Sequence, residues 1–127
     1  MTPRPSPAAL VVLIYKVPRN RRVGLLKFLG NAFPVYERPG GIHMSVFESV
    51  QERGLFVEIA SYDTDRAYRQ DQVRVDKDPE MKRILGRWQK FIDGRPQVLL
   101  VRNVLVPKKG RQGPQRPKRN AGKRVSN

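Results

Sequence analysis

The sequence predicts an α+β fold in which one sheet of four strands carries helices on one face. Three observations predict it. Four apolar segments have the length and the β-branched and aromatic composition of strands. Two intervening regions repeat their apolar residues at helical spacing. The more regular of these, residues 78–94, has a continuous apolar face that must lie on a flat apolar surface, and the strands would supply it.

The first part of the chain predicts a strand and then a helix. Residues 10–17 form a continuous run rich in β-branched residues, which is typical of a central strand, and Pro18 ends it. Asn20 is a suitable N-cap for a helix over residues 20–33, and Pro34 would close that helix because proline lacks the next N–H donor. The apolar residues on or near one face of this helix are Val23, Leu26, Leu29 and Phe33.

The middle of the chain predicts a β-hairpin. A Pro-Gly-Gly turn at residues 39–41 precedes a strand over residues 42–49. Residues 50–54 form the hairpin loop, in which Gly54 can adopt a positive φ. The next strand, residues 55–62, alternates cleanly. One face carries Leu55, Val57 and Ile59, and the other carries Phe56, Glu58, Ala60 and Tyr62.

The second helical region is predicted in two pieces. An Asp-Thr-Asp run at residues 63–65 can cap a piece over residues 64–75. Asp78 can cap the next piece, Pro79 suits its first position, and Gly94 would end it. The apolar face of this last helix consists of Met81, Ile84, Leu85, Trp88, Phe91 and Ile92.

A final strand completes the ferredoxin-like order β-α-β-β-α-β with a four-stranded antiparallel sheet. This strand covers residues 97–106, after a turn at Arg95-Pro96. One domain is predicted over residues 9–106, between a disordered Pro-rich lead (1–8) and a disordered basic tail (107–127).

One face of the predicted sheet would have no helix on it. We expect this face to carry Phe56, Ala60 and Tyr62. A bare apolar face of that size promotes aggregation, so we expect a second copy of the chain to cover it.

The chain is strongly basic, and the excess is uneven. Its 127 residues carry a formal net charge of +15, and residues 107–127 hold eight Lys and Arg with no acid. The tail either contacts a polyanion such as nucleic acid or serves only to solubilise the chain. No apolar run has the length of a membrane span, and no zinc motif or glycine-rich phosphate loop is present. The absence of cysteine excludes disulfides and fits a reducing compartment such as the cytoplasm.

Several motifs, in their order along the chain, resemble those of a known superfamily. They are Tyr15-Lys16-Val17-Pro18, Gly40-Gly41-Ile42 and the run Phe56-Val57-Glu58-Ile59-Ala60-Ser61-Tyr62-Asp63-Thr64-Asp65-Arg66-Ala67-Tyr68, followed by a Trp-bearing helix and a strand. Over residues 10–106 the chain resembles the dimeric α+β barrel superfamily, and within it the antibiotic-biosynthesis-monooxygenase-like domains. The resemblance implies a homodimer with two sheets face to face and a pocket between sheet and helices. It also implies oxygenation of quinols or anthrones without a bound cofactor.

The chain departs from the superfamily pattern at two places. Family members often carry a His four residues after the helical Ala, and here Asp71 stands four residues after Ala67. The haem-degrading branch needs a helical His and an Asn on the first strand. The only His, His43, lies on the second strand, and the first strand has no Asn, so a haem cofactor is not expected.

His43, Glu58 and Tyr62 are the candidate catalytic residues. His43 could be a general base for a phenolic proton, or it could be an edge-strand His that makes one hydrogen bond. Glu58 could be a base with a raised pKa if its face is covered, or it could pair across the sheet with Arg102 or Lys16.

Tyr15, Phe56 and Trp88 are the candidate pocket-lining residues. The hydroxyl groups of Tyr15 and Tyr62 could bind a substrate oxygen, or they could lie at the rim of the sheet. Trp88 could flank the pocket, or it could belong to the core with Leu85 and Phe91.

Two functions follow from these observations. One is a cofactor-independent, monooxygenase-like activity on a small aromatic or quinol-type substrate. The other is a non-enzymatic dimeric module whose tail, residues 107–127, contacts a polyanion. An RNA-binding sheet face is disfavoured because Glu58 would repel phosphate at the centre of the third strand.

Overall fold

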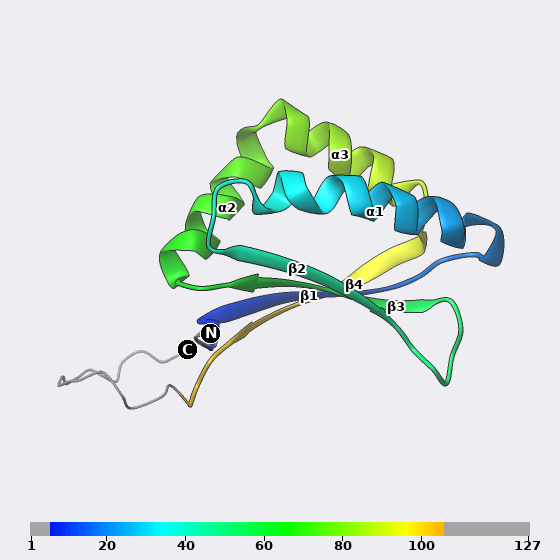
Figure 1. The fold of residues 1–127 in the computed structure, drawn as a ribbon, viewed down its shortest axis with the longest axis horizontal. Coiled ribbons are helices and arrows are strands. Elements are labelled where there is room, and N and C mark those ends of the chain that lie inside the picture. The colour runs from blue at the N-terminus through cyan, green and yellow to red at the C-terminus, as the bar shows by residue number, and fades with distance from the viewer. Residues whose placement is uncertain (1–5, 106–127) are drawn as a thin grey trace, which may run out of the picture.

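The computed structural model describes residues 6–105 of the protein, so the predicted basic tail lies outside the described residues. Its elements form two layers, with all the helices on one side of a twisted sheet (Figure 1). The bounds are β1 (Ala9–Lys16), η1 (Arg19–Arg21), α1 (Arg22–Glu37), β2 (Ile42–Glu48), β3 (Leu55–Tyr62), α2 (Asp65–Lys77), α3 (Pro79–Gln89) and β4 (Asp93–Arg102).

The sheet has the strand order β2-β3-β1-β4, and every neighbouring pair is antiparallel. This is the ferredoxin-like order, in which β1 and β3 are central and β2 and β4 are edges. The predicted fold class is therefore confirmed. Both edge strands are positioned by the hydrogen-bond register that β1 and β3 impose on them.

The predicted assignment of the two sheet faces is wrong. Phe56 and Tyr15 are directly opposite each other and belong to the core cluster that contains Leu25 of α1 and Trp88 of α3. The set Phe56, Glu58, Ala60, Tyr62 therefore faces the helices, and the open face carries Leu55, Val57 and Ile59. Strand alternation separates the two sets, but both are largely apolar, so alternation cannot tell which set the helices cover.

Helix α1 continues through Pro34, which was predicted to end it. Pro34 removes one backbone hydrogen bond and would cost ~3 kcal/mol in an isolated helix. Two tertiary contacts offset this cost, since Tyr36 is buried and its carbonyl and that of Val35 accept hydrogen bonds from Arg74. The buried face of α1 consists of Leu25, Phe28, Leu29, Ala32 and Tyr36.

The face predicted for α1 was thus rotated from the observed one. Val23 is 76% exposed and Leu26 36% exposed, whereas the neighbouring Leu25 is fully buried. Gly24 lies against Phe91, so that a Cβ at Gly24 would come within 3.0 Å of the Phe91 ring. The glycine therefore permits a close approach between α1 and the segment after α3.

Asp78 caps α3, as predicted, but α2 continues to Lys77, whereas it was predicted to end at Val75 with a break over residues 76–78. Thr64 Oγ1 accepts from Ala67 N at 3.0 Å at the start of α2, and Asp78 Oδ1 accepts from Glu80 N at 2.9 Å at the start of α3. Pro79 occupies the first turn of α3, where its missing N–H costs nothing.

The end of α3 and the start of β4 differ from the prediction. The helix ends at Gln89, and Gly94, with φ +73°, lies inside β4 rather than capping α3. The strand begins at Asp93 because Lys16 pairs with Asp93 after a register shift, in which the step from Ile14 to Lys16 lies opposite residues 93–97 of β4. Pro96 is tolerated within β4 because this is an edge strand.

Candidate active site

A cavity of about 200 Å³ lies between the sheet and the helices α2 and α3. Its walls combine apolar side chains with a small number of polar ones, which is the usual composition of a ligand pocket. The polar residues that line it are Tyr36, Glu58, Tyr62, Asp71 and Gln72, and the apolar ones include Val11, Leu13, Met44, Val75, Met81, Leu85 and Trp88.

Glu58 is the most buried charged residue in the described part of the chain, with 3% of its surface exposed. Its Oε1 accepts a hydrogen bond of 2.6 Å from the Tyr15 hydroxyl. Burial raises the pKa of Glu58, and the Tyr15 hydrogen bond opposes that effect by stabilising the carboxylate. The predicted cross-strand partners pair elsewhere, since Arg102 binds Asp65 and Lys16 binds Glu52.

Tyr62 reaches the same cavity from the end of β3. Its hydroxyl donates to Asp71 Oδ2 at 2.6 Å, and Asp71 Oδ1 accepts from Arg74 at 3.1 Å. Burial and the adjacent Asp71 raise the pKa of Tyr62, so this phenol is neutral at physiological pH. The hydroxyls of Tyr62 and Tyr15 are both buried, which corrects the alternative that they lie at the rim.

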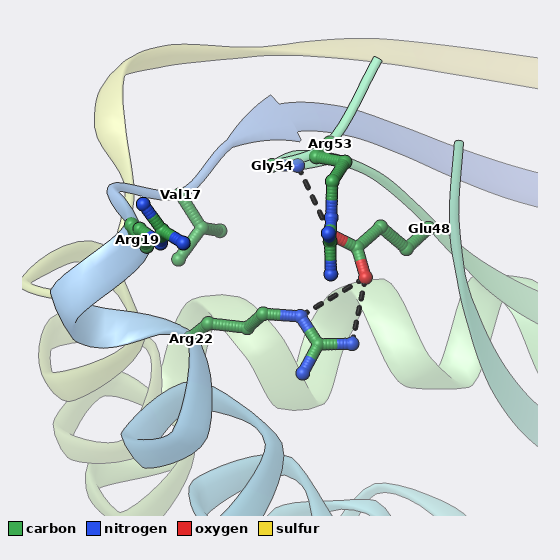
Figure 2. A pocket seen from close by; sticks show the side chains of 6 residues that line it. All are labelled: Val17, Arg19, Arg22, Glu48, Arg53 and Gly54. Atoms are coloured by element: carbon green, nitrogen blue, oxygen red, sulfur yellow. Dashed lines mark hydrogen bonds and ion pairs between the residues drawn. The ribbon is translucent and has the colours of Figure 1, made fainter. Parts of the chain in front are cut away.

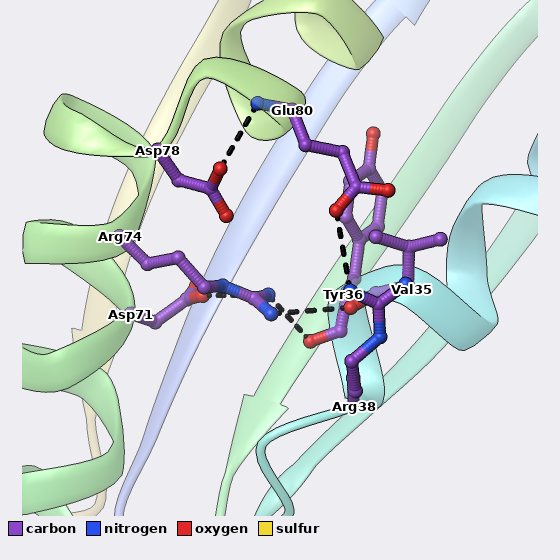
Figure 3. A network of polar contacts seen from close by, with 7 residues as sticks. All are labelled: Val35, Tyr36, Arg38, Asp71, Arg74, Asp78 and Glu80. Carbon is purple, nitrogen blue, oxygen red and sulfur yellow. Dashed lines mark hydrogen bonds and ion pairs between the residues drawn. The ribbon is translucent and has the colours of Figure 1, made fainter.

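Arg74 ties the cavity wall to the end of α1. Its guanidinium donates to the carbonyls of Val35 and Tyr36 at 3.1 and 2.7 Å, in addition to Asp71 (Figure 3). A cation at the C-terminal end of α1 is favourable for the helix dipole. The same contacts hold Asp71 and Tyr36 in place as polar residues of the cavity.

Trp88 serves in both of the ways that the sequence allowed. It belongs to the buried core, and it also lines the cavity. Its ring meets Tyr15 edge-on, with centroids 5.1 Å apart. Its buried Nε1 makes no well-formed hydrogen bond within residues 6–105, although the indole N–H lies close enough to the Tyr15 hydroxyl to oppose the rise in the pKa of that phenol.

The structure brings together only some of the predicted site residues. Glu58, Tyr62 and Trp88 line the cavity, and Tyr15 adjoins it through Glu58. Phe56 stacks on Tyr15 with centroids 6.1 Å apart but lies outside the lining.

His43 lies on the other face of the sheet. It is opposite Ser61 on the edge strand β2, and its Nε2 is 3.1 Å from Asp63 Oδ1. His43 is thus an edge-strand histidine that contacts one neighbouring side chain, which is the alternative to a general base. The sheet separates it from Glu58 and Tyr62.

Sequence reasoning did not include Tyr36, Asp71 or Arg74 among the site residues. Asp71 had one signal, since it stands at the position where the resemblance would place a His. Tyr36 and Arg74 had none, because their roles depend on contacts between α1 and α2 that are 38 and 39 residues apart along the chain.

The described residues show neither a metal site nor a membrane span. No group of three or more His, Cys, Asp or Glu side chains among residues 6–105 could hold a metal ion. None of the helices in this part of the chain has the length and hydropathy to cross a bilayer.

The sequence matches no family model and no curated protein. Solved structures do match, all at low identity. A candidate antibiotic biosynthesis monooxygenase from Nitrosomonas europaea is 9% identical, with a TM-score of 0.64 over 83% of this chain and 97% of that chain. SnoaB, a cofactor-independent oxygenase from Streptomyces nogalater, is 11% identical, with a TM-score of 0.64 over 80% of this chain and 97% of that one.

A third match is a candidate antibiotic biosynthesis monooxygenase from Deinococcus radiodurans, at 10% identity and a TM-score of 0.63 over 79% of this chain and 96% of that chain. Likeness at such identity concerns the fold alone, and at that level it agrees with the fold that the resemblance implies. The chain has the fold of the antibiotic-biosynthesis-monooxygenase-like proteins.

Proposed function

We propose that this protein is a cofactor-independent oxygenase that acts on a small phenol or quinol. The observation that carries the proposal is Glu58, a carboxyl group buried in the wall of a largely apolar cavity. A carboxyl group with a raised pKa is suited to take a proton from a weakly acidic phenol. The fold shared with SnoaB supports the choice of oxygen chemistry.

The residues around Glu58 have complementary roles in this proposal. The Tyr15 hydroxyl holds one carboxyl oxygen, which orients the group. The Trp88 ring lines the cavity and packs edge-on against Tyr15, which helps to keep the Tyr15 hydroxyl beside Glu58. The apolar walls exclude water, so that the phenolate, once formed, is poorly solvated and more easily oxidised.

The proposed reaction balances without a further reagent. Glu58 takes the phenolic proton, and the phenolate gives one electron to O₂. The resulting superoxide and aryloxyl radical combine to form a C–O bond, and the proton on Glu58 returns to the peroxide. The ring C–H proton and the distal oxygen then leave as water. A phenol C–H becomes a quinone carbonyl, and the substrate supplies all four electrons that O₂ accepts.

The size of the cavity restricts the substrate. At about 200 Å³ it is smaller than the ~300–1,000 Å³ typical of pockets for drug-sized ligands. A one-ring phenol or quinol therefore fits the space better than a polycyclic anthrone.

The test is oxygen uptake by the full chain on a panel of one-ring and two-ring phenols and quinols, above the autoxidation rate in buffer. We expect Glu58→Gln to lower the rate by ~10²-fold or more, the usual contribution of a general base. The matched control is Glu52→Gln, which makes the same change at an exposed site. With ¹⁸O₂, one labelled oxygen should enter the product and the other should enter water.

Two results would count against the proposal. Uptake that is equal in the wild type and in Glu58→Gln would remove Glu58 as the base. The absence of uptake above autoxidation across the panel would remove the oxygenase activity itself.

A further inference from the structure

A second cavity, of about 390 Å³, lies where the end of β1, the start of α1 and the β2–β3 hairpin meet. It shares no lining residue with the candidate active site. Figure 2 shows the side chains around it, and three of the six are arginines. The lining residues are Val17, Arg19, Arg22, Glu48, Arg53 and Gly54.

One of the three arginines is held in a fixed position. Arg22 Nε and Nη2 both donate to Glu48 Oε1, at 3.0 and 2.7 Å. The other carboxylate oxygen, Oε2, accepts from Gly54 N at 3.0 Å. Glu48 thereby joins the first residue of α1 to the hairpin, and the Arg22 hydrogen bonds lower the pKa of Glu48.

The hairpin side of the cavity is also fixed by its backbone. Gly54 has φ +89°, a conformation that favours glycine, and its carbonyl accepts from Val17 N at 2.8 Å. A Cβ at Gly54 would come within 3.0 Å of the Val17 carbonyl oxygen. The end of β1 and the hairpin are thus locked together beside Arg22, so the cavity wall is formed before any ligand arrives.

The cavity carries an excess of positive charge. Three guanidinium groups face one carboxylate, which leaves a net charge of +2 on the lining. Within residues 6–105, no ion pair joins Arg19 or Arg53 to a carboxylate. The first turn of α1 contains no acidic residue, and its N-cap makes no side-chain hydrogen bond. The Arg22–Glu48 pair can be explained as a structural link, and the charge of Arg53 lowers the pKa of Glu48 further without forming an ion pair, whereas Arg19 acts on no carboxylate in the described part of the chain.

We propose that this cavity binds the phosphate or diphosphate group of a small molecule. A doubly charged anion would balance the lining, and guanidinium groups match phosphate oxygens through paired hydrogen bonds. A volume of about 390 Å³ is within the ~300–1,000 Å³ of small-molecule pockets. A concave site fixed at its base favours a compact ligand over the extended backbone of a nucleic acid.

The test is calorimetric titration of the full chain with inorganic pyrophosphate at constant ionic strength. The double variant Arg19→Gln/Arg53→Gln removes two charges from the cavity and breaks no ion pair of the described residues. The control Arg66→Gln/Arg69→Gln removes two exposed charges from α2, away from this lining. We expect the cavity variant to weaken the affinity by roughly tenfold or more, which is about 1.4 kcal/mol, and the control by less than roughly twofold.

Binding of pyrophosphate should also change the NMR signals of the residues that line the cavity. In ¹⁵N-resolved spectra, pyrophosphate should shift the Arg22 side-chain Nε–H signal and the Gly54 amide in the wild type, and it should shift them much less in the cavity variant.

Three outcomes would overturn the proposal. They are no saturable binding by the wild type, an equal loss of affinity in the two double variants, and displacement of pyrophosphate by a short single-stranded oligonucleotide that binds far more tightly. The last would make nucleic acid the ligand.

Discussion

At the scale of single residues, Glu58 determines the chemistry of the candidate active site. A carboxyl group that is 3% exposed loses nearly all of its hydration, and one hydrogen bond from Tyr15 replaces only part of it. The residue therefore lowers stability whenever it is ionised. Buried titratable groups of this kind in a cavity wall are typical of functional sites.

Glu58→Gln should stabilise the fold at neutral pH. The folded state holds the Glu58 proton more tightly than the unfolded state, because burial raises the pKa in the folded chain. Wild-type stability therefore falls as pH rises from the unfolded pKa of about 4.3 through the higher folded value. We expect the variant to exceed the wild type by about 1 kcal/mol or more at pH 8, with the gap closing toward pH 4. Urea unfolding across this range measures it, and a gap independent of pH would contradict it.

Tyr62→Phe should destabilise the fold. The change deletes the hydroxyl that donates to Asp71 at 2.6 Å and leaves a buried carboxylate oxygen without that donor. The expected loss is about 1–3 kcal/mol in the free energy of unfolding. Tyr68→Phe is the matched control, because the Tyr68 ring packs edge-on against Tyr62 with centroids 5.4 Å apart and its hydroxyl makes no hydrogen bond within residues 6–105. Equal losses in the two variants would show that the Tyr62–Asp71 hydrogen bond is not the source of the loss.

At the scale of elements, the sequence predicted correctly those features that depend on residues close together in the chain. The bounds of β3 are as predicted, because a hairpin glycine and strict alternation define them. The cap of α3 by Asp78 is also as predicted, because a cap depends on neighbouring residues. The continuation of α1 through Pro34 and the start of β4 at Asp93 were missed. These depend on Arg74 and on the register with β1, which lie far away in the sequence.

The residues of the candidate site also fall into two groups, those that a local pattern placed correctly and those whose contacts lie between distant parts of the chain. The alternation of β3 placed Glu58 and Tyr62 on one face, and helical spacing placed Trp88 on the face that packs inward. The partners of these residues, Tyr15 and Asp71, lie on other elements, and no sequence pattern pairs them. His43 was grouped with Glu58 by residue type alone, and the register puts it on the opposite face.

Asp78→Ala should weaken α3 without altering the end of α2. Its side chain satisfies the Glu80 amide, whereas its backbone N–H donates to Arg74 O independently of the side chain. Loss of an N-cap costs about 0.5–2 kcal/mol. Thermal unfolding should show this decrease in Asp78→Ala, and Asp76→Ala, at an exposed position in the last turn of α2, should change stability by less than about 0.5 kcal/mol. A loss in Asp78→Ala no greater than that in Asp76→Ala would refute the assignment of Asp78 as the cap.

At the scale of the whole molecule, the sheet face away from the helices is largely apolar. Leu10, Val12 and Ile14 of β1 pair there with Ser61, Ile59 and Val57 of β3. On the same face, Leu99 and Val101 of the edge strand β4 are both 41% exposed, and Phe47 of β2 is 57% exposed. A contiguous apolar surface of this kind marks an interaction site. The proposal that a second copy covers it remains the prediction made from the sequence.

Val12→Lys tests that prediction at the centre of the open face. Val12 lies on the central strand β1, between Ile59 of β3 and Leu99 of β4. In sedimentation, the wild type should behave as a dimer of the 14.6 kDa chain. The variant should sediment as a monomer, because a dimer would bury two lysine charges in an apolar interface. Val23→Lys, at a position on α1 that is 76% exposed, should remain dimeric. A monomeric wild type, or a Val12→Lys dimer as tight as the wild type, would show that another partner or none covers this face.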